Sequence, residues 1–462
     1  MSMHIHILGI CGTFMGGIAM IARQAGFKVT GADQNVYPPM SEELQKAGIE
    51  IYQGYDAKQL DLRPDLIVVG NVMRRGMPVI ERMLNENFPY VSGPGWLEEH
   101  YLKQKCVLAV AGTHGKTTTS AMLTWILDVC GKNPGFLIGG IPGNYGISAR
   151  NTDSPYFVIE ADEYDCAFFD KRSKFVHYHP QALIINNIEY DHADIFDSVR
   201  DIERQFHHLV RTIPSKGLVV APRADKNVRD ALAMGCWTPV VTTGLSDADW
   251  SYKMLREDGT EFCILHKGAE RAHVNFACTG EYNVKNALNA VVAAGYCGID
   301  PEAAAAALSS FVLPKRRMEL KGEACGVSVY DDFAHHPTAV RVTLHGMREH
   351  LGREAHIIAV FEPRSNSMRM GANHEALAAS FCDADETFIY APSDLAWNAE
   401  ALAGEKIRVV HDFDALINEI CQSARKGSTV IVMSNGSFNG IHAKILNKLK
   451  ARSFPPLTAS GK

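Results

Sequence analysis

The residues best suited to chemistry form a glycine-rich segment, AGTHGKTTT, at residues 111–119. It follows an apolar run and precedes a stretch with helical periodicity that ends near Gly131. Glycines let main-chain N–H groups approach a phosphate, and the N-terminus of a helix favours negative charge. Lys116 can neutralise phosphate oxygens, and Thr117 can offer its hydroxyl to Mg²⁺. Although Val110 occupies the position of the usual first glycine, the spacing predicts a P-loop rather than a glycine turn without a ligand.

Acidic and amide side chains follow the two next apolar runs, YFVIEADEYD and QALIINNIEYDH. The carboxyl ends of parallel strands meet at one edge of a sheet, where ligands of open α/β sheets bind. Hard Mg²⁺ prefers carboxylate oxygen, so this edge is a predicted magnesium site, with a solvated acidic loop as the alternative. The side chains in question are Glu160, Asp162, Glu163, Asp165, Asn187, Asp191 and His192.

A second glycine-rich turn, GICGTFMGG, lies near the N-terminus after the apolar run HIHIL. Cys11 stands where the dinucleotide fingerprint GxGxxG has its second glycine. Asp33 closes the next predicted strand and is placed to accept ribose hydroxyls. The turn therefore indicates a nucleotide of some kind, or else a glycine turn that serves only helix and strand packing.

Charged side chains also follow two strands in the last third of the chain, and one arginine lies in a linker before them. Arg317 belongs to the basic run after Pro314, where a guanidinium could reach a phosphate as domains close. An exposed arginine is otherwise usually a solvated side chain. The residues at the two strand ends are Asp331, Asp332, His335, His336 and Arg364.

Short apolar runs alternate with amphipathic stretches, which predicts an α/β protein with mostly parallel sheets. With 462 residues, the chain exceeds one hydrophobic core, and we expect domains at residues 1–105, 106–313 and 314–462. The second should contain a hairpin around Asp258 and Gly259 and a helix over residues 283–295. Four strands are predicted in the third, and residues 453–462 are expected to form a disordered tail.

The composition argues against several classes of protein. The formal net charge is −6 and no basic stripe is present, so no nucleic acid is expected. Eleven scattered cysteines without a CxxC pair are typical of reduced thiols in a cytoplasmic protein. The N-terminus lacks a signal-peptide pattern, and no apolar run reaches the roughly 18 residues that span a bilayer, so no membrane association is expected. The oligomeric state stays open.

Six motifs, taken in order, resemble those of the Mur ligases, which attach amino acids or peptides to UDP-N-acetylmuramate precursors of peptidoglycan. They cover nearly the whole chain: AGTHGKTTT, EADEYD, NNIEYDH, GEYNVKNALNA, the Arg-Met-Glu run at Arg317, and YDDFAHHPTAV. The resemblance implies ATP and Mg²⁺ as cofactors and three domains. These are an N-terminal Rossmann-like domain for the UDP-sugar, a central P-loop ATPase domain, and a C-terminal Rossmann-like domain that contacts the peptide and the nucleotide.

Within that family, other stretches are most similar to enzymes that join L-Ala-γ-D-Glu-meso-diaminopimelate to UDP-N-acetylmuramate in peptidoglycan recycling. Those stretches are HIHILGICGTFMGG, GADQNVYPPMS, EADEYDCAFFDKRSKFVHYHP and FEPRSNSM. The implied reaction passes through an acyl phosphate on the sugar's lactyl carboxylate. The alternative within the family is the L-alanine ligase of the de novo pathway, which typically has a His-Arg pair where this chain has Pro363-Arg364.

By position in these motifs, the resemblance implies a role for each of the following residues. ATP would be bound by Gly112, Thr113, His114, Gly115, Lys116, Thr117, Thr118, Asn283, Asn286 and Asp332. The expected Mg²⁺ ligands are Thr117, Glu163 and His192. The expected catalytic residues are Lys116, Glu163, His192, Arg317, His335 and Arg364. The UDP-sugar would be bound by Gly9, Cys11, Gly12, Thr13, Asp33 and Ser92.

Two readings from other classes compete. A dinucleotide-dependent oxidoreductase would require a strict GxGxxG, which Cys11 breaks, and would leave the P-loop without a role. A non-catalytic, nucleotide-controlled binding module would bind ATP without substrate-stimulated release of ADP.

Overall fold

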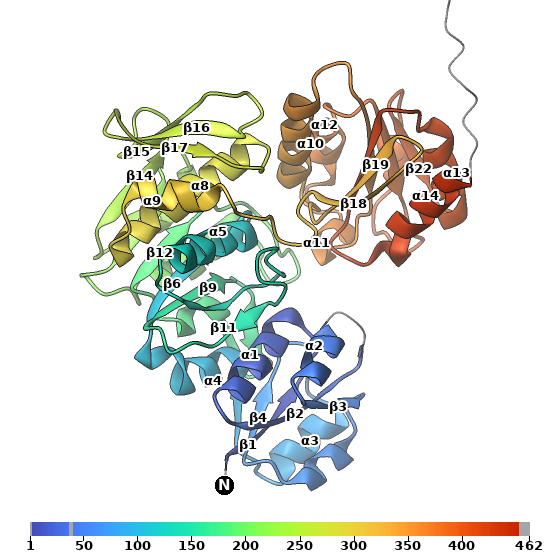
Figure 1. Ribbon diagram of the computed structural model, residues 1–462. Helices are drawn as coiled ribbons and strands as arrows, with labels where there is room; N and C mark the ends of the chain where they lie inside the picture. The colour runs from blue at the N-terminus through green and yellow to red at the C-terminus, as the bar shows by residue number, and fades with distance from the viewer. Residues whose placement is uncertain (1, 37–39, 452–462) are drawn as a thin grey trace, which may run out of the picture.

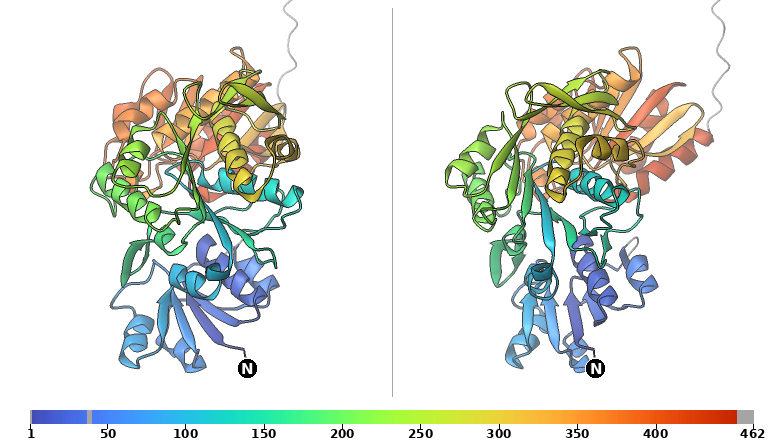
Figure 2. Two further views of the ribbon diagram at one scale, coloured as in Figure 1. Left: turned by 90° about the vertical axis from the view of Figure 1, so that its left-hand side faces the viewer. Right: turned by 60° about the vertical axis from the view of Figure 1, so that its left-hand side comes forward.

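The computed structural model describes residues 2–36 and 40–451, so the predicted tail at residues 453–462 lies outside the described residues. The chain forms three α/β domains, each around one main sheet, and the fold class is the predicted one. The N-terminal and C-terminal domains pack against different sides of the central domain (Figures 1 and 2). Within the described residues, no helix combines the length and the apolar character that crossing a membrane requires.

The N-terminal domain is a five-stranded parallel sheet in the order β3-β2-β1-β4-β5. Its central strand, HIHIL, is buried along its whole length although it contains two histidines, as expected for a parallel sheet covered on both faces. The strands are β1 (His4–Leu8), β2 (Lys28–Asp33), β3 (Glu50–Gln53), β4 (Leu66–Val69) and β5 (Tyr90–Ser92). The helices are α1 (Thr13–Gln24), α2 (Met40–Lys46), α3 (Pro78–Asn85) and α4 (Gly93–His100).

The central domain is built on a ten-stranded sheet in the order β17-β16-β15-β14-β13-β12-β6-β9-β7-β8. Its strands are β6 (Cys106–Ala111), β7 (Gly135–Leu137), β8 (Ala149–Arg150), β9 (Tyr156–Ala161), β12 (Ala182–Ile185), β13 (Leu218–Pro222), β14 (Val240–Gly244), β15 (Trp250–Met254), β16 (Glu261–His266) and β17 (Ala269–Asn275). A separate hairpin pairs β10 (Asp165–Ala167) with β11 (Asp170–Ser173). The helices are α5 (Lys116–Val129), α6 (Val199–Val210), α7 (Lys226–Ala233), α8 (Glu281–Ala294) and α9 (Pro301–Leu308).

Most strand pairs of this sheet are parallel, and the antiparallel hairpin predicted around Asp258 and Gly259 is confirmed as β15 and β16. Gly259 has a φ of 80°, the left-handed conformation that such a turn favours. The helix predicted over residues 283–295 is confirmed as α8. A third antiparallel strand, β17, was not predicted.

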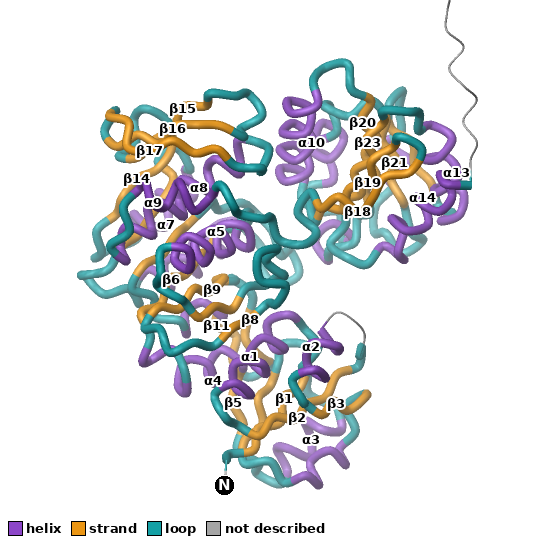
Figure 3. The backbone as a smooth tube through the Cα atoms, in the orientation of Figure 1, coloured by secondary structure: helices purple, strands orange, loops and turns teal. Residues whose placement is uncertain are grey.

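The C-terminal domain has six strands in the order β18-β19-β23-β20-β21-β22. They are β18 (Glu319–Ala324), β19 (Val327–Asp332), β20 (His356–Phe361), β21 (Glu386–Tyr390), β22 (Ile407–Val410) and β23 (Ser428–Met433). Helices α10 (Pro337–Leu351), α11 (Asn366–Arg369), α12 (Leu377–Ser380), α13 (Phe413–Ser423) and α14 (Ile441–Lys450) accompany this sheet (Figure 3). β18 is antiparallel to β19, and the other pairs are parallel.

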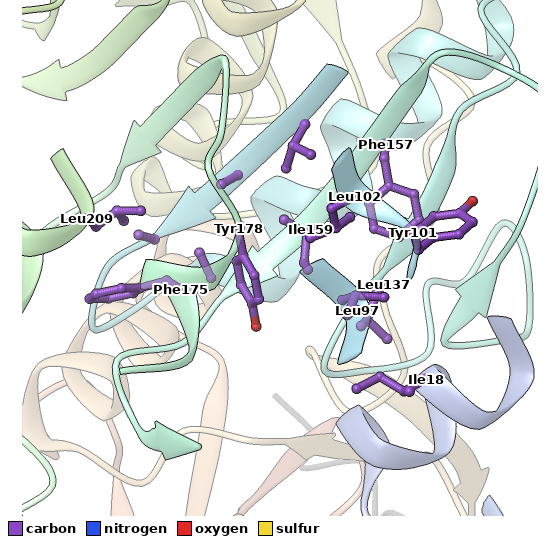
Figure 4. Close-up of a cluster of buried hydrophobic side chains, with 14 of the residues drawn as sticks. Ile18, Leu97, Tyr101, Leu102, Leu137, Phe157, Ile159, Phe175, Tyr178 and Leu209 are labelled. Carbon is purple, nitrogen blue, oxygen red and sulfur yellow. The ribbon is translucent and has the colours of Figure 1, made fainter. Parts of the chain in front are cut away.

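The N-terminal and central domains share a hydrophobic core. Ile18 of α1 and Leu97 of α4 belong to the same buried cluster as Leu137 and Ile159 of the central sheet (Figure 4). Helix α1 approaches strand β7 so closely that a Cβ on Gly17 would overlap the side chain of Leu137. Among the described residues, both buried clusters of the C-terminal domain consist of that domain's own residues. Within the described residues, the C-terminal domain therefore shares no buried apolar cluster with the central domain.

Candidate active site

The predicted P-loop connects β6 to α5 at the carboxyl end of the central sheet. Gly112 and Gly115 have φ values of 135° and 81°, which residues with a Cβ rarely adopt. A Cβ on Gly115 would lie 2.6 Å from Oδ1 of Asn286, and one on Gly112 would lie 3.0 Å from the Cβ of Asn186. Both positions therefore require glycine for conformation and for space. The loop presents the unpaired N–H groups that begin α5, which is the geometry that binds phosphate.

Lys116, the first residue of α5, contacts the buried Glu163 of the loop after β9. Its Nζ lies 3.0 Å from Glu163 Oε2, and Glu163 is 1% exposed. His192 Nε2 lies 3.1 Å from the other carboxylate oxygen. Burial disfavours the charged imidazolium, but the hydrogen bond and the charge of Glu163 outweigh it and raise the pKa of His192 to about 9. Three predicted catalytic residues from separate segments thus meet at one carboxylate.

Asp162, Glu163 and His192 could together hold a metal ion, because their ligand atoms all lie within 4.8 Å of one another. Burial raises the pKa of the Asp162 carboxyl, but the charges of Lys174 and Lys116 lower it well below the usual range. Two anionic carboxylates fit the preference of a hard divalent cation, whereas His192 would have to lose its proton to act as a ligand. The magnesium site stays a prediction.

Thr117, the remaining predicted metal ligand, lies beside this cluster. Its hydroxyl donates to Glu160 Oε1 at 3.2 Å and accepts from Nη2 of Arg317 at 3.3 Å. Glu160 also accepts the N–H of Gly139 at 2.8 Å. Arg317 follows the interdomain linker and packs 5.0 Å from the ring centroid of Phe333. An arginine at the start of the C-terminal domain therefore reaches the P-loop, as the sequence suggested.

The other acidic candidates have different surroundings. Asp165 pairs with the exposed Lys171 on the β10–β11 hairpin, so it fits the solvated alternative. Asn187 accepts the main-chain N–H of His114 at 2.8 Å and so braces the P-loop. Asp191 accepts the N–H of His192 at 2.7 Å, and His192 itself has a φ of 55°.

A cavity of about 290 Å³ lies where the central and C-terminal domains meet. It is lined by His192 of the central domain and by His335 and Arg364 of the C-terminal domain. Burial lowers the pKa of His335, which keeps its imidazole neutral. The side chain of Arg364 crosses directly over Gly436, where a Cβ would overlap it. Three predicted catalytic residues from two domains thus share one cavity.

The remaining nucleotide-site predictions fall in four places. Asn283 and Asn286 are buried on α8 next to Gly115. Thr118 is buried in the first turn of α5. Both carboxylate oxygens of Asp332 accept main-chain N–H groups of its own domain, from Met318 and Ala334, each at 2.8 Å. Thr113 and His114 both contact Glu189.

The predicted UDP-sugar residues separate into two groups. Gly9, Cys11, Gly12 and Thr13 form the turn between β1 and α1, and Asp33 ends β2 beside them. Asp33 accepts the N–H groups of Cys11 at 2.9 Å and Asn35 at 3.0 Å, so its carboxylate also holds the turn in shape.

Ser92 lies apart from that turn, at the end of β5. Its hydroxyl accepts the N–H of Gly95 as the cap of α4 and donates to Asp170 Oδ2 at 3.3 Å. It lines a second cavity, of about 500 Å³, together with Asp170, Arg172 and His177 of the central domain. This larger cavity is not lined by any of the P-loop residues.

Sequence reasoning missed four residues that touch the predicted ones. Tyr164 packs its ring against His192 and hydrogen-bonds Asp194. Lys174 lies 2.7 Å from Asp162 and faces the ring of Phe14 at the start of α1. The other two are Glu189 and Ser367. All four belong to stretches whose resemblance was noted, but nothing in a single sequence indicates which distant residues they contact.

Three family models match successive parts of the chain. Residues 4–105 match the "Mur ligase family, catalytic domain", residues 110–294 the "Mur ligase middle domain", and residues 316–436 the "Mur ligase, glutamate ligase domain". A relative from Escherichia coli (strain K12) is 52% identical over 454 residues, which cover 98% of this chain and 99% of the relative. The chain belongs to the Mur ligase family.

That relative is named UDP-N-acetylmuramate–L-alanyl-γ-D-glutamyl-meso-2,6-diaminoheptandioate ligase. The chain is also similar to the crystal structure of a murein peptide ligase from Psychrobacter arcticus, with 45% identity, a TM-score of 0.76, and coverage of 98% of this chain and 100% of that one. A Mur ligase named UDP-N-acetylmuramate–L-alanine ligase, from Rubrobacter xylanophilus, is 35% identical and covers 79% of each chain.

Proposed function

We propose that this Mur ligase joins the tripeptide L-Ala-γ-D-Glu-meso-diaminopimelate to UDP-N-acetylmuramate, with hydrolysis of ATP, in peptidoglycan recycling. The observation that carries the proposal is the cavity at which His192 of the ATP-binding domain meets His335 and Arg364 of the C-terminal domain. The 52% identical E. coli relative bears the name of this reaction over nearly the full length of both chains. An odd number of scattered cysteines fits a cytoplasmic enzyme.

The P-loop residues support an ATP-dependent reaction. Bound ATP would supply the phosphoryl group that converts a carboxylate, a poor electrophile, into an acyl phosphate. The phosphates would lie against the N–H groups at the start of α5 and the Lys116 ammonium. These groups are already in place, so they need no reorganisation during phosphoryl transfer. Mg²⁺ would be held by Glu163 and His192, with the Thr117 hydroxyl beside them, and would neutralise charge on the phosphates.

The C-terminal residues that line the cavity with His192 support binding of a peptide with a free amine there. Arg364 carries a guanidinium that suits a peptide carboxylate. His335, neutral because it is buried, can accept a proton from the peptide's ammonium group, which leaves the free amine to attack the acyl phosphate and release phosphate. Contact between the two domains excludes water from the reactive acyl phosphate, which would otherwise hydrolyse.

The test is ADP release by purified protein with ATP, Mg²⁺ and UDP-N-acetylmuramate, comparing the tripeptide, free L-alanine and no acceptor. We expect the tripeptide to stimulate release and the ligated product to appear by mass spectrometry. A preference for free L-alanine would refute the tripeptide assignment and favour the alternative ligase. ATP binding without stimulation by either acceptor would instead indicate a nucleotide-controlled binding module.

A further inference from the structure

Glu189 follows β12 and contacts the P-loop through both its main chain and its side chain. Its N–H donates to the hydroxyl of Thr113 at 2.8 Å, and that hydroxyl lies 3.3 Å from its carbonyl oxygen. Its carboxylate Oε2 lies 3.2 Å from Nε2 of His114. Two consecutive P-loop residues, both expected to touch the nucleotide, are therefore held by one glutamate.

The same carboxylate oxygen also contacts the C-terminal domain. The hydroxyl of Thr338, in the first turn of α10, donates to Glu189 Oε2 at 2.7 Å. Nδ1 of His336, the cap of α10, lies 3.5 Å from that oxygen. The rings of His114 and His336 face each other with centroids 4.8 Å apart. Glu189 thus lies between the nucleotide loop of one domain and the start of a helix in another.

Charge strengthens this arrangement. Burial raises the pKa of the Glu189 carboxyl, but the hydrogen bond and charge of His114, together with Thr338, outweigh it and lower the pKa to about 2. The carboxylate is therefore ionised at neutral pH, and hydrogen bonds to an ionised acceptor are roughly twice as strong as neutral ones. The loss of Thr338 would leave the anion less well satisfied and free to shift, and His114 would shift with it.

A second contact between these two domains uses the same helix but does not reach the P-loop. Near the other end of α10, Nδ1 of His350 lies 3.0 Å from Oδ2 of Asp258 in the β15–β16 turn. Asp258 otherwise accepts from Thr260 and lies near Arg256. Helix α10 therefore contacts two carboxylates of the central domain, Glu189 and Asp258. Of these two residues, Glu189 also contacts the P-loop.

We propose that Glu189 is a positioning residue that couples docking of the C-terminal domain to the nucleotide site. When the hydroxyl of Thr338 docks against its carboxylate, Glu189 fixes Thr113 and His114 in the conformation that binds ATP. The proposal rests on the proposed function only in taking ATP as the nucleotide. Glu189 lies outside the cavity. Through this residue, the affinity for ATP would rise when the C-terminal domain docks.

The test is the Kd for ATP, measured by calorimetry on the full chain with Mg²⁺ and without sugar or peptide. Thr338→Val removes the hydroxyl donor with little change in size, and it touches neither the P-loop nor the cavity. We expect it to weaken ATP binding by about fivefold or more, because coupling between two sites typically changes affinity about 5- to 150-fold. Thr338→Ser keeps the hydroxyl and should bind ATP as the wild type does.

Three further variants separate coupling from general loosening. Glu189→Ala should weaken ATP binding, and adding Thr338→Val to it should cause no further loss, because both act through one contact. His350→Asn removes the contact of α10 to the other carboxylate, Asp258, and should leave the Kd within twofold of wild type. A wild-type Kd in Thr338→Val, additive losses in the double variant, failure of Thr338→Ser to restore binding, or an equal loss in His350→Asn would each overturn the proposal.

Because this titration needs no acceptor, it separates the two proposals. A wild-type protein that binds ATP but ligates nothing would refute the proposed function and leave the comparison of variants intact. In steady-state assays, the Glu189 and Thr338 variants should raise the KM for ATP more than they lower kcat. If the variants changed only the thermal stability and left the KM for ATP and kcat unchanged, Glu189 would have a structural role and the proposal would be refuted.

Discussion

At the scale of single residues, the buried carboxylate of Glu163 holds two other candidate catalytic side chains in place. It contacts Lys116 with one oxygen and His192 with the other, so one anion orients a P-loop cation and a candidate metal ligand. Sequence motifs were enough to name these three residues, because each lies at the carboxyl end of a strand or the start of a helix. They were not enough to identify Tyr164 or Lys174, whose partners depend on the path of the hairpin after β9.

Replacement of Lys116 by alanine should lower the rate of ADP release by about 10²–10³-fold, because the transferring phosphoryl group loses its fixed cation. The free energy of unfolding should fall by about 1–3 kcal/mol, since Glu163 loses one of the two cationic partners it has within the described part of the chain and keeps His192. Steady-state kinetics and urea unfolding measure the two effects. Lys171→Ala, which removes an exposed ion pair with Asp165, is the matched control and should change neither. Ordinary turnover by the Lys116 variant would contradict the assigned site.

The stability of the N-terminal domain should depend on pH through His6, which is fully buried in β1. Burial lowers its pKa from 6.5 to about 4. Between these values the unfolded chain binds a proton that the folded chain does not, so stability falls as pH falls from 6.5 to 4. His6→Asn keeps a hydrogen-bonding group near Thr30 but does not titrate. Between pH 7 and pH 5, the wild type should lose up to about 2 kcal/mol more than this variant in urea unfolding. Equal losses would exclude His6 as the cause.

At the scale of elements, the four buried strands of the C-terminal domain were predicted and its two edge strands were not. In the C-terminal domain, the predicted strands correspond to β19, β20, β21 and β23, whose apolar runs are covered on both faces. The two that were missed, β18 and β22, form the edges of that sheet. The sequence of β18 is ELKGEA, because an edge strand is exposed and polar residues there discourage further pairing. Its hydropathy therefore resembles that of a loop.

Helix α1 should be sensitive to the smallest enlargement on the face that meets the central domain. Gly17→Ala places a methyl group against Leu137 and 3.2 Å from the Cβ of Ala149, both of which are buried. Such overpacking typically costs about 1–3 kcal/mol, which denaturant unfolding can measure. Gly295→Ala is the control, because an added Cβ there meets no atom within 4 Å, and it should be neutral or slightly stabilising. An unchanged midpoint for Gly17→Ala would show that α1 can move away without loss.

At the scale of the whole molecule, the sequence predicted three α/β units but not how they pack together. Nothing in the spacing of apolar residues indicated that α1 and β7 share a core while the C-terminal domain shares none. Several contacts made by that domain are single hydrogen bonds, such as Ser367 to Asp191 at 2.9 Å and Asn366 to Asp194 at 3.0 Å. Helix α10 also packs closely against the start of α8, where a Cβ on Gly346 would lie 2.8 Å from the Cα of Gly280. Polar pairs between domains leave no periodic pattern in the sequence, so only the structure identifies them.

Arg317 tests whether this arrangement of domains is the reactive one. Its guanidinium donates to Thr117 from the start of the C-terminal domain. Arg317→Ala should lower kcat by about 10²-fold or more, as expected when an arginine contacts transferring phosphate. Binding of UDP-N-acetylmuramate, measured by calorimetry, should not change, because the N-terminal domain packs on the central domain independently. Arg408→Ala, at an exposed ion pair with Glu386, is the control. A kcat within threefold of wild type would place Arg317 outside the reaction.

The position of β23 has a consequence for synthesis of the chain. Although it is the last strand of the sequence, β23 lies between β19 and β20. A nascent chain that has not yet emerged beyond residue 428 therefore lacks the strand that joins the two halves of that sheet. The strands of the first two sheets are complete by Ser92 and Asn275, so those sheets can form while the ribosome is still translating. Until β23 emerges, the strands of the last domain keep unpaired edges, so we expect this domain to be the most aggregation-prone part of the nascent chain.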